Sequence, residues 1–100
     1  MTDLGPVGQQ ILMENEKVRV WQITLAPGES QPWHQHKHPY IVIAIEGAAN
    51  VVTVIDGTEI DAPEPTGSVI YREPGPVHKL TNIGETTYVS RLVELIDVTD

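Results

Sequence analysis

Short apolar runs rich in Val, Ile and Thr recur along the chain, and Gly and Pro separate them. Such runs suit the pleated surface of a sheet, and the turn residues between them mark strand ends. No long segment places apolar residues at the 3.6-residue repeat of a helix, so helix is expected to be nearly absent. The pattern predicts an all-β sandwich or barrel. Its strands are expected at Lys17–Leu25, Tyr40–Glu46, Ala49–Ile55, Glu59–Ala62, Ser68–Arg72, Val77–Asn82 and Thr86–Ile96.

The turns and the ends of the pattern define the domain. Asp56-Gly57 lies between two β-branched runs and predicts a tight hairpin, because a type I′ turn needs positive φ at its central residues. Residues 1–10 lack a pattern and are expected to form an N-terminal arm of a single domain spanning 1–100. Ile41–Ile45 is apolar on both faces, which suits a strand with a second sheet or subunit against it. A homodimer is therefore expected, and exchange of an N-terminal strand is one route to it.

The charge and the lack of cysteine exclude several classes of partner and site. The chain has 100 residues, with 6 basic against 14 acidic residues and a formal charge of -8. It offers no basic stripe for phosphates, so neither nucleic acid nor an anionic membrane is an expected partner. There are no cysteines, which excludes disulfides, thiolate metal sites and thiol nucleophiles. No signal peptide or long apolar span is apparent, and we expect a cytoplasmic protein.

Histidine is the residue type most unevenly distributed. Three of the four histidines, His34, His36 and His38, fall within five residues, and the fourth is His78. Alternate residues of an extended strand point to the same side, so His34 and His36 can converge inside a barrel. A third ligand from a neighbouring strand would have to be His78. Three neutral imidazoles suit Zn, Fe, Ni, Cu or Mn and leave coordination positions open.

The same histidines have a plainer interpretation. An isolated His-x-His is more often surface decoration than a site, but here the cluster follows one Pro-Gly turn and His78 follows another. His38 shares the parity of His34 and His36, and it is interpreted either as a fourth ligand or, preferably, as a rim residue that touches substrate. Arg91 is the arginine favoured as a partner for a substrate carboxylate, because it shares parity with apolar residues of its strand.

The spacing of these residues resembles the two motifs of the cupin family. Gly28, His34-Gln35-His36, Tyr40 and Gly47 match the first motif; Gly67, Gly75, His78 and Asn82 match the second. The resemblance spans residues 28–82. It implies a small antiparallel jelly-roll β-barrel with one divalent transition metal per chain, bound by His34, His36 and His78.

The chain departs from the family pattern in two places. Tyr40 stands where the motif commonly has a Glu ligand, and Glu73 where it commonly has Pro. A phenol with a pKa near 10 is normally neutral, so Tyr40 is a weak ligand, an acid/base group over the site, or an aromatic residue at the barrel mouth. The resulting site resembles that of the cupins that lack the acidic ligand, thiol dioxygenases among them.

These observations favour a metal-dependent enzyme acting on a small organic carboxylate or dicarbonyl. Oxygenase, isomerase and lyase chemistries all occur among the proteins that the chain resembles. In this hypothesis Tyr40 is the catalytic residue, and His38 and Arg91 contact substrate. The alternative is a barrel that binds a metal or a small molecule without chemistry, and a third interpretation is an empty structural barrel whose histidines only fill space.

Overall fold

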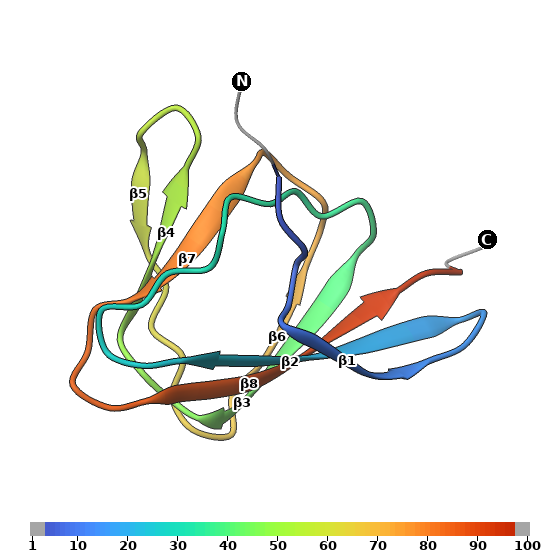
Figure 1. Cartoon of the computed structure of the whole chain (residues 1–100), viewed down its shortest axis with the longest axis horizontal. Helices are drawn as coiled ribbons and strands as arrows, with labels where there is room; N and C mark the ends of the chain where they lie inside the picture. The colour runs from blue at the N-terminus through green and yellow to red at the C-terminus, as the bar shows by residue number, and fades with distance from the viewer. Residues whose placement is uncertain (1–3, 98–100) are drawn as a thin grey trace.

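The computed structural model describes residues 4–97, and every regular element in that range is a strand (Figure 1). The strands form a five-stranded sheet in the order β1-β2-β8-β3-β6 and a three-stranded sheet in the order β5-β4-β7, with all pairs antiparallel. The expected all-β, antiparallel fold is confirmed. The strands are Gln10–Glu14 (β1), Val18–Leu25 (β2), Tyr40–Glu46 (β3), Asn50–Val54 (β4), Glu59–Asp61 (β5), Val69–Arg72 (β6), His78–Asn82 (β7) and Tyr88–Leu95 (β8).

Seven of these strands lie where the sequence predicts them, and β1 is the one that was missed. All five residues of β1 are exposed, so it has no alternation of buried and exposed positions to reveal it. It forms the edge of the larger sheet by pairing with β2 of the same chain. The expected N-terminal arm packs against the barrel where it is described. Val7 belongs to the buried core, and the Gly5 amide donates a 2.7 Å hydrogen bond to the Trp33 carbonyl.

The core lies between the two sheets, where Ile23, Leu25, Ala44, Tyr88 and Leu92 are buried together. Burial alternates strictly along β8, and the inward positions are Tyr88, Ser90, Leu92 and Glu94. The inward side of this central strand is thus the more polar one, while its outward side carries Val89, Arg91, Val93 and Leu95. On β8, therefore, the set of alternate residues that is mostly apolar faces away from the barrel interior.

Asn82 fastens the turn between β7 and β8 to the end of β2. Its side chain is fully buried, and its Nδ2 donates to the carbonyls of Leu25 (3.0 Å) and Thr86 (2.7 Å). Its Oδ1 accepts a 2.9 Å hydrogen bond from the Gly84 amide. This one amide therefore binds three backbone groups from two separate segments, and it ties the turn after β7 to the end of β2.

We expect Asn82→Ala to lower the free energy of unfolding by about 2–4 kcal/mol, because it removes three hydrogen bonds between a buried side chain and backbone groups. Urea unfolding followed by fluorescence measures the loss. Asn15→Ala is the matched control, since Asn15 also accepts hydrogen bonds from two amides but does so in an exposed turn. Its cost is expected to be about 1 kcal/mol or less. Equal losses for the two variants would contradict the role given to Asn82.

Candidate metal centre

The segment between β2 and β3 carries the first two site histidines, and it crosses the open end of the barrel without forming a regular strand (Figure 1). It is pinned to β7 at two isolated bridges. One joins Ser30 to Thr81, and the other joins His34 to His78. At the second bridge each backbone amide donates to the carbonyl of the other residue at 2.9 Å. This reciprocal pairing places the side chains of His34 and His78 next to each other on one face.

Three imidazoles meet at this point. The candidate ligand atoms of His34, His36 and His78 all lie within 4.8 Å of one another. The ring centroids are 4.7 Å apart for His34 and His78, 5.0 Å for His34 and His36, and 5.3 Å for His36 and His78. His34 and His36 are buried, and His78 is half-buried. The structure thus brings together the three residues that the sequence proposed as metal ligands.

The donor set fits a divalent transition metal. His34 Nδ1 is 2.9 Å from the Pro32 carbonyl, which fixes the ring and leaves Nε2 to face the site. His36 Nδ1 is buried and has no hydrogen-bond partner in the described part of the chain. A buried nitrogen without a partner is costly, and a bound cation is one way to satisfy such a centre.

Burial keeps these imidazoles neutral, as metal ligation requires. Burial first, and then the charges of the nearby His34 and His78, lower the pKa of His36 to about 3. The pKa of His78 falls to about 4, chiefly through burial and then through the charges of His34 and Arg72. The pKa of His34 is also lowered by burial, against the hydrogen bond to Pro32.

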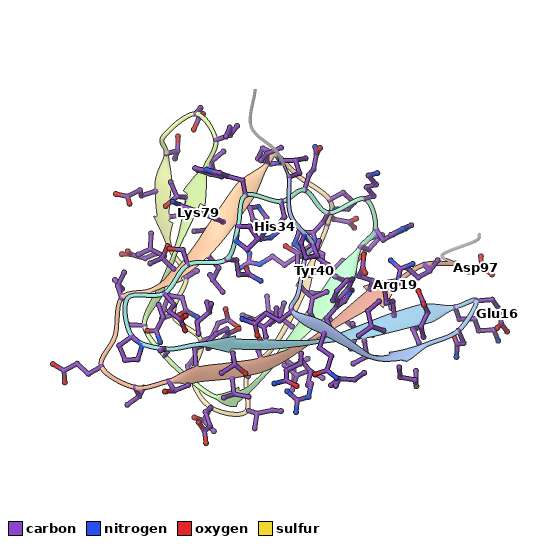
Figure 2. The ribbon with its side chains drawn as sticks, in the orientation of Figure 1. Glu16, Arg19, His34, Tyr40, Lys79 and Asp97 are labelled. Carbon is purple, nitrogen blue, oxygen red and sulfur yellow. The ribbon has the colours of Figure 1, made fainter. Side chains whose placement is uncertain are left out.

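Tyr40 begins β3 and lies flat against one of the three imidazoles. Its ring stacks on His36 with the centroids 3.7 Å apart and the planes 14° apart. Only 7% of the residue is exposed, so it is part of the buried site and not an exposed aromatic at the barrel mouth. Burial raises the pKa of the phenol, and the charge of Arg72 opposes that rise. Tyr40 is therefore a neutral hydroxyl beside the histidines (Figure 2).

A cavity of about 230 Å³ opens beside the histidines and Tyr40. Its walls are mostly apolar, but Arg72 and Glu73 stand at its edge and Glu64 lies within it. Arg72 pairs directly with Tyr40 across β6 and β3, so both side chains project to the same face of the sheet. Its side chain makes no ion pair within the part of the chain described. The apolar lining includes Ile23, Val42, Val52, Ala62, Leu80 and Leu92.

The two residues predicted to contact substrate lie elsewhere. Arg91 pairs with Ile43 and Gln22 on the outer face of the larger sheet, and its guanidinium donates to the Ser90 carbonyl. His38 lines a separate, smaller pocket with Arg19 and Glu94. Neither residue reaches the cavity beside the three histidines. The parity argument for Arg91 was misleading because the inward face of β8 is the polar one.

Sequence reasoning also missed two polar groups inside the cavity, Glu64 and Tyr88. Glu64 lies in the Pro-rich stretch between β5 and β6, where a carboxylate is typical of a solvated loop. Tyr88 opens a strand and had no special signal. Arg72 was one of three arginines in predicted strands, and only the pairing of β6 with β3 singles it out.

A small antiparallel barrel with a three-histidine centre in its interior defines the class of protein. The family model for the cupin domain matches residues 21–93. The chain therefore belongs to the cupin domain family, and the expected jelly-roll architecture is confirmed. No curated protein matches the sequence.

Solved structures agree on the fold. A cupin domain from Bordetella pertussis Tohama I is similar, with a TM-score of 0.79 and 23% identity over 95% of this chain and 97% of that one. A cupin 2 conserved barrel domain protein from Salinispora arenicola CNS-205 is 28% identical, with a TM-score of 0.64 over 89% of this chain and 74% of that one. An oxalate oxidase in complex with the substrate analogue glycolate has a TM-score of 0.62 at 17% identity, over 83% and 44% of the two chains.

The lowered pKa values predict how pH affects the metal-free protein. A histidine in the unfolded chain has a pKa near 6.5. Below that pH the unfolded state therefore binds protons that the buried imidazoles of the folded state do not bind. Stability is expected to be complete above about pH 6.5 and to fall as the pH drops toward the folded pKa values of about 4 and 3. The slope is up to about 1.4 kcal/mol per pH unit for each imidazole.

Urea unfolding of chelator-treated protein at a series of pH values tests this expectation. His36→Gln is expected to flatten the curve, because it removes one group that protonates only on unfolding. The carboxylates that also titrate are common to both proteins and cancel in the difference. Parallel curves for the wild type and the variant would contradict the assigned neutrality of His36.

Proposed function

We propose that this cupin domain is a metal-dependent enzyme of the oxygenase, isomerase or lyase type that acts on a small organic carboxylate or dicarbonyl. One observation carries the proposal: three imidazoles, two of them buried and one half-buried, converge within 4.8 Å of one another beside a mostly apolar cavity. His34, His36 and His78 would hold one divalent transition metal, either Fe, Zn, Ni, Mn or Cu. That metal would supply Lewis-acid chemistry at its open coordination positions.

The chain's own residues supply binding and proton handling. Arg72 lines the cavity and makes no ion pair with any residue in 4–97, and it takes the role of carboxylate anchor in place of Arg91. Tyr40 is a buried neutral phenol next to both Arg72 and the histidines, so its hydroxyl can orient a substrate oxygen or carry a proton to it. The apolar walls exclude water and strengthen each of these polar contacts.

One observation favours the second candidate, a barrel that binds a metal or a small molecule without chemistry. Tyr40 occupies the position at which the family motif commonly carries a Glu ligand, so the centre lacks an anionic donor and holds its metal through neutral groups alone. Turnover distinguishes the two candidates. The metal-loaded protein is assayed on a panel of small carboxylates with and without O₂, and at least one of them is expected to yield product. Binding without product would favour the barrel that binds without chemistry.

Metal content tests the centre itself. We expect about one equivalent of metal per chain, and we expect His34→Ala, His36→Ala and His78→Ala each to lower the metal affinity by more than about 100-fold. His38→Ala is the matched control, because that imidazole lies outside the cavity, and its affinity is expected to match the wild type. Plasma mass spectrometry after dialysis and competition with a chelator measure both quantities. A metal-free wild type, or equal losses in all four variants, would contradict the site.

We also propose that the protein is a homodimer, built on the outer face of the larger sheet. Strand pairing aligns an apolar row across all five strands on that face: Tyr71, Ile41, Val93, Val20 and Met13. The edges of this row are open, with Tyr71 54% and Met13 48% exposed. Exposed apolar patches of this kind mark association surfaces.

The cytoplasmic location expected from the sequence stays a prediction, and no helix in the described residues is long and apolar enough to cross a membrane.

Tyr71→Lys combined with Ile41→Lys is expected to convert the dimer to a monomer, because it places two charges in the apolar row. Light scattering behind a sizing column measures the mass of each species. Ile83→Lys is the control; Ile83 is equally accessible, at 60% exposed, but follows β7 of the smaller sheet. A monomeric wild type, or a dimer that the double variant leaves intact, would exclude this face.

A further inference from the structure

The cavity contains a second polar centre, Glu64 and Tyr88, to which the proposed metal site gives no role. Both residues line the cavity, yet Glu64 is only 7% exposed and Tyr88 is fully buried. The Tyr88 hydroxyl donates a 2.6 Å hydrogen bond to Glu64 Oε1. On the other oxygen, Oε2, the only contact in the described part of the chain is a long one, 3.4 Å from Asn50 Nδ2. No cation pairs with this carboxyl there.

The backbone holds Glu64 firmly in this position. Ala48 and Glu64 form a bridge in which each amide donates to the other carbonyl at 3.1 Å. Gly47 permits the close approach, since a Cβ there would lie 2.3 Å from the Glu64 carbonyl oxygen and 2.5 Å from the Thr66 amide nitrogen. The carboxyl group is therefore placed in the cavity by the fold.

The surroundings favour the uncharged acid form of Glu64. Burial raises the pKa of its carboxyl, while the hydrogen bonds from Tyr88 and Asn50 and the charge of Arg72 act in the opposite direction. Tyr40 and Tyr88 are the other titratable groups whose charges couple to it, and burial raises the pKa of Tyr40. Burial also raises the pKa of Tyr88, so Tyr88 stays a donor to Oε1. The acid proton then resides on Oε2, whose one neighbour in the described part of the chain is the Asn50 amide at a long 3.4 Å; the Oδ1 of that amide is buried and also has no partner there.

We infer that the cavity accepts a small oxo-carboxylate, with its carboxylate at Arg72 and the histidines and its keto oxygen hydrogen-bonded to Oε2 of Glu64. A keto oxygen is an acceptor only, so it complements an acid proton carried by Oε2. The mostly apolar lining of the cavity suits the carbon chain that joins these groups. This inference rests on the proposed function for the carboxylate end, whereas the contribution of Glu64 can be measured separately.

Isosteric ligand pairs test the assignment. Zinc-loaded protein is titrated calorimetrically with 4-oxopentanoate and 4-methylpentanoate, and with the longer pair 5-oxohexanoate and 5-methylhexanoate. In each pair a methyl group replaces the keto oxygen. We expect the wild type to bind the oxo member of at least one pair about tenfold or more tightly, because a buried donor left without an acceptor is costly. Glu64→Leu is expected to bring that ratio to about one or below.

A pH series separates hydrogen bonding from a structural role. The preference of the wild type for the oxo acid is expected to fall as the pH rises through the pKa of Glu64, because the donor proton is then lost. Glu64→Gln keeps an N–H donor at the same position, so its preference is expected to be independent of pH. This arm remains decisive if Glu64→Leu does not fold.

The outcomes distinguish the inference from the proposed function. Failure of the wild type to bind zinc overturns the metal site. A second outcome is that the wild type and the Glu64 variants bind zinc equally and show the same ratio of oxo-acid to methyl-acid affinity. That result overturns the role of Glu64 and leaves the metal site intact. A zinc-loaded wild type that binds none of the four acids also overturns it.

Discussion

The site depends on a backbone pairing, the reciprocal hydrogen bonds between His34 and His78. These bonds join a segment without regular structure to the first residue of β7, across the open end of the barrel. Their geometry sets two imidazoles side by side, and the next alternate residue, His36, completes the group. Tyr40 then stacks on His36 at the start of β3. A single register position thus determines which side chains can share one ligand.

The cavity combines a set of polar groups with mostly apolar walls. The histidines, Tyr40 and Arg72 line it, and so do Glu64 and Tyr88. Apolar walls lower the local dielectric constant, which strengthens satisfied polar contacts and penalises unsatisfied ones. The same effect lowers the pKa of the histidines and raises that of Glu64, so all of these groups tend toward their neutral forms. Neutral imidazoles are ready to ligate, and a neutral acid is ready to donate.

The central strand β8 explains both a success and an error of sequence reasoning. Its strict alternation made the strand easy to predict, because a half-buried strand has a period of two residues. The assumption that apolar residues face inward then selected Arg91, although Tyr88, Ser90 and Glu94 occupy the interior. Three of the four inward positions of β8 carry polar groups, so hydrophobicity identifies the wrong face there. The outer face carries an apolar row instead, which is the basis of the proposed homodimer.

The amino-acid sequence by itself determined the strand content, the turns and the family. Local preferences and the spacing of Gly and His residues carry that information, and they also indicated His34, His36 and His78 as one group. Only the tertiary structure decided which groups accompany them. Arg72 is at the cavity because β6 pairs with β3, and Glu64 because Gly47 lets its loop approach closely. These are contacts between residues far apart in the chain, and a linear pattern does not encode register between distant strands.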